Sequence, residues 1–122
     1  MRFYQDKDFK EISHWCSLRD RPAPEEWALP DSGFIVDGVA CGFLVMTNTK
    51  IGILDFYISN PHADKEARRE ALEEITNELI EAAKEVGIRS IVFSTQFESI
   101  RQLGHFFGFT SDGEYSYFTK EL

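Results

Sequence analysis

The spacing of apolar residues along the chain alternates between a helical and an extended period. In residues 8–19, apolar side chains recur every three or four positions, which predicts a short amphipathic helix. Residues 64–86 keep the same period for longer and predict a long helix, with Asp64 at its start and Gly87 after its end. We expect this helix to bury one stripe of side chains: Ala71, Leu72, Ile75, Leu79, Ala82 and Val86.

The region between these helices contains short apolar runs that are separated by turn residues. Residues 34–36, 39–46 and 50–58 predict an antiparallel meander of three strands, and residues 2–4 could begin another strand. Gly42 and Gly52 fall inside the predicted strands, where a glycine indicates a bulge or a close approach of another group.

The last third of the sequence predicts a buried strand, a shorter helix and a hairpin. These are residues 91–93, residues 98–107 and a turn at Asp112-Gly113 that joins residues 109–110 to residues 115–118. The whole order predicts one α/β domain over residues 1–122, in which a single mixed β-sheet is flanked by helices.

Composition narrows the classes of partner and compartment. The 122 residues carry a net charge of -8, which argues against nucleic acid and anionic membrane as main partners. We see no apolar run long enough to span a bilayer and no signal-peptide core, so we expect a cytoplasmic protein. Cys16 and Cys41 are expected to be buried free thiols. The three scattered histidines do not predict a metal site.

Two short motifs lie at informative places in this order of elements. Ile58-Ser59-Asn60-Pro61 connects a strand to the long helix, and Gly108-Phe109 follows the last helix. With the element order, they resemble the GNAT N-acetyltransferase superfamily along nearly the whole chain. Together with Leu29-Pro30, they also resemble short GNAT-like proteins of tailed phages and bacteria. This resemblance implies that the protein could be encoded by a phage and located in the cytoplasm of the host.

The resemblance implies that acetyl-CoA binds between two splayed strands, here residues 53–58 and 91–94. The family's pyrophosphate loop corresponds to residues 63–69, which contain no glycine. The resemblance therefore places the cofactor on Ile58, Lys65, Ala67, Arg68 and Arg69, with Ala67 standing in for one glycine. A structural alternative is that Arg68 pairs with Asp64, and Arg69 with Glu73, on a solvated helix face.

The resemblance also implies direct transfer of an acetyl group from acyl-CoA to an amine-bearing substrate. The family's usual acid is a tyrosine four residues before the Gly-Phe, and that position is Gly104 here. The remaining catalytic candidates are Asp55, His105 and Tyr115. The alternatives are an ordinary hydrogen-bonded or outward-facing carboxylate for Asp55, a position on the surface or at the C-terminal end of the helix for His105, and packing for Tyr115. A non-catalytic GNAT-fold module that binds a protein partner is the second functional hypothesis, and both monomer and homodimer remain open.

Overall fold

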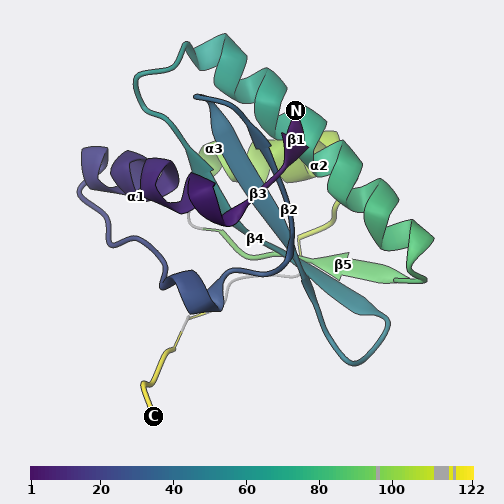
Figure 1. The fold of residues 1–122 in the computed structure, drawn as a ribbon. Coiled ribbons are helices and arrows are strands. Elements are labelled where there is room, and N and C mark those ends of the chain that lie inside the picture. The colour runs from purple at the N-terminus through teal and green to yellow at the C-terminus, as the bar shows by residue number, and fades with distance from the viewer. Residues whose placement is uncertain (96, 112–115, 117) are drawn as a thin grey trace.

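The computed structural model describes residues 1–95, 97–111, 116 and 118–122 (Figure 1). Its strands are β1 (Arg2–Phe3), β2 (Ser32–Val36), β3 (Ala40–Met46), β4 (Ile51–Ser59) and β5 (Ser90–Val92). Its helices are α1 (Phe9–Leu18), α2 (Lys65–Glu85) and α3 (Glu98–Phe106), with short 3₁₀ turns at Asp6–Asp8 and Glu26–Ala28. The predicted helices and the three-stranded meander are therefore confirmed within one or two residues at each end.

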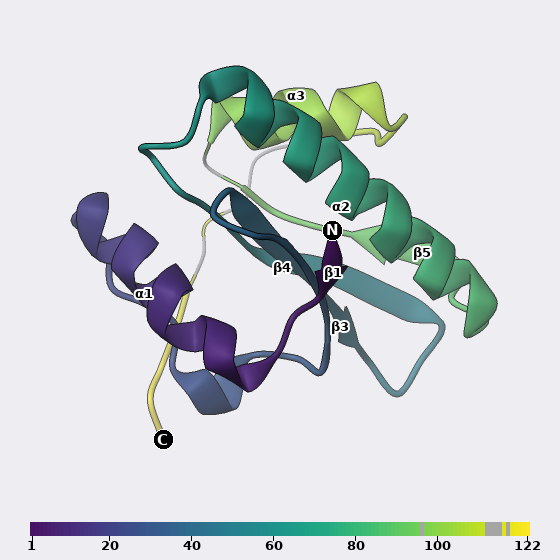
Figure 2. The ribbon, with the colours of Figure 1, turned by 45° about the horizontal axis from the view of Figure 1, so that its top comes forward.

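The five strands form one mixed sheet in the order β1-β2-β3-β4-β5. The first three pairings are antiparallel, and β5 joins β4 in parallel after the α2 crossover. Helices α2 and α3 lie on one face of the sheet and α1 lies on the other (Figure 2). This arrangement confirms the predicted α/β class, a mixed sheet flanked by helices.

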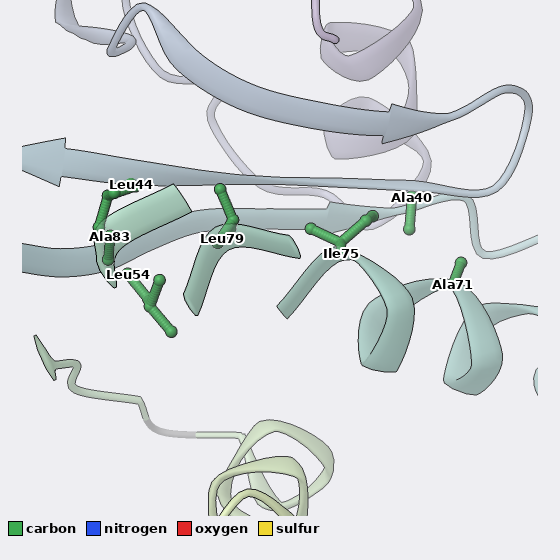
Figure 3. Close-up of a cluster of buried hydrophobic side chains, with 7 residues drawn as sticks. All are labelled: Ala40, Leu44, Leu54, Ala71, Ile75, Leu79 and Ala83. Atoms are coloured by element: carbon green, nitrogen blue, oxygen red, sulfur yellow. The ribbon is translucent and has the colours of Figure 1, made fainter. Parts of the chain in front are cut away.

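The main core lies between α2 and strands β3 and β4. Ala71, Ile75, Leu79 and Ala83 form a row along the helix, and they face Ala40, Leu44 and Leu54 of the sheet (Figure 3). The predicted stripe was right for Ala71, Ile75 and Leu79 but wrong for Val86, which is 61% exposed. The buried row advances by four residues at each step, so it ends on Ala83, and Val86 follows the last helical turn as its cap.

The strand predicted at residues 91–93 is present as β5, but the prediction that it is buried was wrong. Ile91 is half-buried and Val92 is 46% exposed. The reason is that, among the described residues, β5 is the last strand of the sheet and pairs with β4 over only three residue pairs. Of the predicted final hairpin, Asp112-Gly113 and Tyr115 lie outside the described residues, and Phe109 and Thr110 are described without a strand.

Candidate functional site

Strands β4 and β5 separate shortly after they begin. Their parallel register is Ile51↔Ser90, Gly52↔Ile91 and Ile53↔Val92, whereas β4 itself continues to Ser59. A cavity of about 550 Å³ lies where these two strands diverge, between β4, α2, α3 and the segment after β5. Its lining is mostly apolar and includes Leu54, Phe93, Phe97, Ile100 and Leu103, together with Asp55, Tyr57 and Thr76.

A bulge in β4 shapes the wall of this cavity. Asp55 pairs with Phe43 and Ile58 pairs with Cys41, so Phe56 and Tyr57 together stand opposite the single residue Gly42. Phe56 has a φ of 56°, in the left-handed region that non-glycine residues rarely adopt. The backbone N–H of Phe56 donates to Asp55 Oδ1 at 2.7 Å. The bulge therefore turns the β4 backbone at the point where Asp55 meets the cavity.

Gly42 allows the ring of Tyr57 to lie flat against β3. A Cβ at residue 42 would be 2.7 Å from Cε1 of Tyr57, which is closer than real contacts allow. This confirms the expectation that Gly42 marks a bulge or a close approach. The phenol of Tyr57 is thereby directed toward α2, where its hydroxyl lies 2.8 Å from Oγ1 of Thr76.

The hydroxyls of Tyr57 and Thr76 form a short directional chain. Thr76 donates its one proton to the carbonyl of Leu72 at 2.7 Å, so Tyr57 must be the donor to Thr76. Burial raises the pKa of Tyr57 to about 12. The sequence analysis did not select either residue. The available signal was Thr76, a polar residue beside the apolar stripe of α2.

The space beside Gly104, the position where the resemblance would place a tyrosine, is filled by another side chain. Gly104 is buried in α3, and a Cβ at this position would lie 2.5 Å from Cζ of Phe93. The Phe93 ring packs edge-on against Phe109, with a centroid distance of 5.0 Å. The ring of Phe93 thus fills the space into which a side chain at residue 104 would project.

A second and larger groove, of about 1280 Å³, adjoins the first cavity. It lies where the end of β4, the start of α2, the end of α1 and one side of α3 come together. Tyr57, Phe97, Ile100 and Leu103 line both hollows, which makes them neighbours. The candidate site therefore has two adjacent parts, one apolar between β4 and α3 and one charged at the start of α2.

The predicted cofactor residues lie at this charged end. Ile58, Lys65, Arg68 and Arg69 line the groove, whereas Ala67 does not. The carboxylate of Asp64 accepts hydrogen bonds from the backbone N–H groups of Glu66 at 3.1 Å and Ala67 at 3.2 Å. A negative side chain of the protein itself therefore already occupies the start of α2 as its cap.

The two arginines at the start of α2 differ in their partners. Arg69 pairs with Glu66 and, at 2.6 Å, with Glu73, and these pairs raise its pKa. The suggested Arg69–Glu73 pair is confirmed. The suggested Arg68–Asp64 pair was wrong, because Asp64 is used as the helix cap. Nε of Arg68 is buried and has no hydrogen-bond partner among the described residues.

Two arginines that the sequence analysis did not select complete the groove. Arg19 ends α1 and donates to Oγ of Ser59 at 2.9 Å and to the carbonyl of Ser59 at 3.3 Å. Arg21 lies with its guanidinium 4.0 Å from the centre of the Phe97 ring. No local pattern marks them, because they reach the groove only when α1 packs beside β4.

The two predicted catalytic residues that the structure describes, Asp55 and His105, do not line the same hollow. Asp55 is exposed and lines the first cavity, beside Tyr57. His105 is exposed on α3 and lines neither hollow. Tyr115 lies outside the described residues. The catalytic roles of Asp55, His105 and Tyr115 stay predictions.

The described residues offer neither a metal site nor a membrane-spanning helix. They hold no cluster of three or more His, Cys, Asp or Glu side chains that could bind a metal ion. Across the same residues, every helix is too short or too polar to cross a membrane. Cys16 and Cys41 are both buried and free.

Comparison with known proteins identifies solved structures that share this fold. No family model matches the sequence, and no curated protein matches it. A point mutant of TTHA1254 from Thermus thermophilus superposes with a TM-score of 0.69 at 12% identity, covering 99% of this chain and 95% of that one. An acetyltransferase from Trypanosoma brucei superposes with a TM-score of 0.65 at 11% identity, covering 98% and 97%. The chain has a GNAT-like acetyltransferase fold. At these identities the likeness concerns the fold alone.

Proposed function

We propose that the chain binds an acyl-CoA, acetyl-CoA first, where β4 and β5 diverge, and transfers the acyl group to an amine. The observation that carries this proposal is the parting of β4 and β5 after three residue pairs, beside a cavity of about 550 Å³. The charged groove at the start of α2 shares four lining residues with this cavity, so an apolar arm and a polar arm lie side by side. The T. brucei acetyltransferase of the same fold supports the assignment.

The two arms suit the two parts of an acyl-CoA. Leu54, Phe93 and Phe97 give the first cavity the apolar wall that an acyl group and an alkyl amide arm require. Beyond Ile53, β4 has no strand beside it on the β5 side within the described part of the chain. Its outer backbone groups can therefore pair with an extended, amide-bearing ligand as a neighbouring strand would.

The proposed chemistry is acyl transfer between sulfur and nitrogen. The amine nitrogen forms a bond to the acyl carbon, the thioester C–S bond breaks, and the thiolate leaves and takes up a proton. A base must remove one proton from the amine. We assign this role to Asp55, whose exposed carboxylate lies at the cavity. Tyr115 and His105 remain the proposed sources of the proton that the thiolate accepts.

Calorimetric titration with acetyl-CoA and with desulfo-CoA tests the binding step. We expect both to bind with a Kd on the order of 10 µM, about 7 kcal/mol of binding free energy. Ile100→Trp, which fills the junction of the two hollows, should weaken binding by at least about tenfold. Val86→Trp is the matched control, because Val86 is exposed and lines neither hollow.

Turnover is tested separately, by release of free thiol from acetyl-CoA in the presence of a panel of amines. Absence of heat and of a thermal shift at millimolar acetyl-CoA would refute the proposed cofactor. Binding without thiol release from any amine would refute the transfer step and leave a domain that only binds the cofactor.

A further inference from the structure

The groove at the start of α2 carries a charge opposite to that of the whole chain. The protein has a net charge of -8, yet five cationic side chains and three carboxylates line the groove. The cations are Arg19, Arg21, Lys65, Arg68 and Arg69, and the carboxylates are Asp64, Glu66 and Glu73.

The three carboxylates are already committed to other groups. Asp64 caps the backbone N–H groups of Glu66 and Ala67. Glu66 and Glu73 both pair with Arg69. Lys65 and the three arginines Arg19, Arg21 and Arg68 have no carboxylate partner among the described residues. With five cations and three carboxylates, the side chains that line the groove carry a net charge of +2.

The fold holds two of these arginines in place from the α1 side. After α1, Asp20 adopts a φ of 53°, its N–H donates to the carbonyl of Ser17, and the N–H of Arg21 donates to the carbonyl of Cys16. This pair of bonds is a Schellman turn with an aspartate where glycine is usual. The turn reverses the chain directly between Arg19 and Arg21. Arg19 is then fixed by Ser59 and Arg21 by the ring of Phe97.

The arginines also influence one another. Burial lowers the pKa of Arg19, and the charges of Arg68 and Arg21 lower it further. Gathered like charges raise the free energy of the empty groove, and an anion that enters the groove removes this cost. Arg68 also keeps a buried donor, its Nε–H, without a described partner.

We propose that Arg19, Arg21 and Arg68 form a binding site for an oxyanion of a ligand, either a phosphate or a carboxylate. Guanidinium groups bind both oxyanions through paired, charge-assisted hydrogen bonds. The site works through side chains, since Asp64 already takes two of the backbone N–H groups at the start of α2. For the identity of the ligand, the inference rests on the proposed function: the oxyanion belongs either to the cofactor or to the acceptor amine.

The experiment measures the binding of inorganic pyrophosphate to the full chain by calorimetry at low salt. We expect Arg19→Gln, Arg21→Gln and Arg68→Gln each to weaken pyrophosphate binding by at least about tenfold, the loss of one charge-assisted contact. Arg101→Gln is the control, because Arg101 is exposed, pairs with Glu98 and lines neither hollow, yet its loss changes the net charge equally. Arg21 is exposed, so its variant keeps the test valid even if the Arg68 variant unfolds.

A second titration, with CoA at saturation, identifies the source of the oxyanion. If CoA displaces pyrophosphate, the arginines hold a phosphate of the cofactor; if both bind together, the arginines hold an anionic group of the acceptor. Pyrophosphate binding that is absent, or equal in all four variants, overturns the inference. Tight CoA binding in that case would leave the proposed function standing. Pyrophosphate binding that depends on the three arginines, without any CoA binding, would support the anion site and refute the cofactor.

Discussion

Asp55 and Phe56 are tied by a hydrogen bond within the bulge of β4, where Oδ1 of Asp55 accepts the N–H of Phe56 at 2.7 Å. Phe56 has a φ of 56°, a left-handed conformation that costs a residue with a Cβ on the order of 1 kcal/mol. Its ring is half-buried and packs edge-on against Phe43 at 6.1 Å. The carboxylate of Asp55 therefore stabilises the bulge at the same position where we propose that it acts as the base.

Two substitutions at Asp55 separate these tasks. Asp55→Asn keeps an oxygen acceptor for Phe56, whereas Asp55→Ala removes it. We expect the alanine variant to lose about 1 kcal/mol of unfolding free energy and the asparagine variant to lose less. If Asp55 is the base, both variants should lose roughly 100-fold in kcat/KM or more. Chemical denaturation and thiol-release assays measure the two effects. Full activity of Asp55→Asn would restrict Asp55 to its role in the bulge.

Gly104 should tolerate no side chain while Phe93 keeps its position. Helix propensity alone favours alanine over glycine by about 1 kcal/mol. The contact of 2.5 Å with the Phe93 ring opposes this gain, and Phe109 packs against the ring. We expect Gly104→Ala to lose roughly 1–3 kcal/mol through overpacking. In a double-mutant cycle by urea denaturation, Phe93→Leu should reduce that loss. Equal losses in both backgrounds would show that Phe93 is not the obstacle.

Asp8 should make the protein sensitive to acid. Its side chain is 5% exposed and pairs with Arg2 at 2.7 Å, and this partner lowers the pKa of the carboxyl. Since the pKa is lower in the folded state, the stabilisation is complete above the unfolded-state value of about 4 and is lost as the pH falls below it. Asp8→Asn should cost about 1–3 kcal/mol at pH 7, and the difference from wild type should shrink toward pH 2.

Asp37 supplies the matched control for this measurement. It pairs with the same Arg2 at 2.7 Å, but its side chain is 70% exposed. We expect a smaller loss for Asp37→Asn than for Asp8→Asn, because a solvated ion pair contributes little. Equal losses in denaturation curves at pH 7 would contradict the importance of burial at Asp8.

Tyr57 should make the protein sensitive to alkali. Burial raises its pKa to about 12, so the folded state keeps the proton that an unfolded chain loses near pH 10. Stability from this group is constant below about pH 10 and declines as the pH rises toward 12. Tyr57→Phe should cost about 1 kcal/mol at pH 7, through the lost bond to Thr76, and should flatten the decline. Phenolate absorbance during alkaline titration provides an independent check on the pKa.

The two thiols should be inert in the folded protein. Burial raises the pKa of Cys41 to about 12 and also raises that of Cys16, so little thiolate forms near pH 8. We expect Ellman's reagent to label both thiols only after denaturation. Rapid labelling of the native protein would contradict their burial.

Most of the fold could be predicted because its determinants are local. The period of the apolar residues in α2, the cap at Asp64 and the turn at Asp37-Gly38 each depend on residues that are close along the chain. The Arg69–Glu73 pair belongs to the same class, since a helix brings residues four apart together. The error at Val86 arose because the buried row ends on Ala83 and Val86 follows the last helical turn as its cap.

The site depends on contacts between distant parts of the chain, and these only the tertiary structure decided. Arg19 meets Ser59 forty residues away, and Phe93 fills the space beside Gly104. The bulge at Phe56 follows from the register between β3 and β4. A single sequence carries strong signals for periods and caps because they are interactions within about four residues. The sequence carries no comparable signal for the side chains that face one another across a groove, because their positions depend on how whole elements pack. The sequence by itself therefore determined the elements and their order, and packing determined which charges meet in the groove.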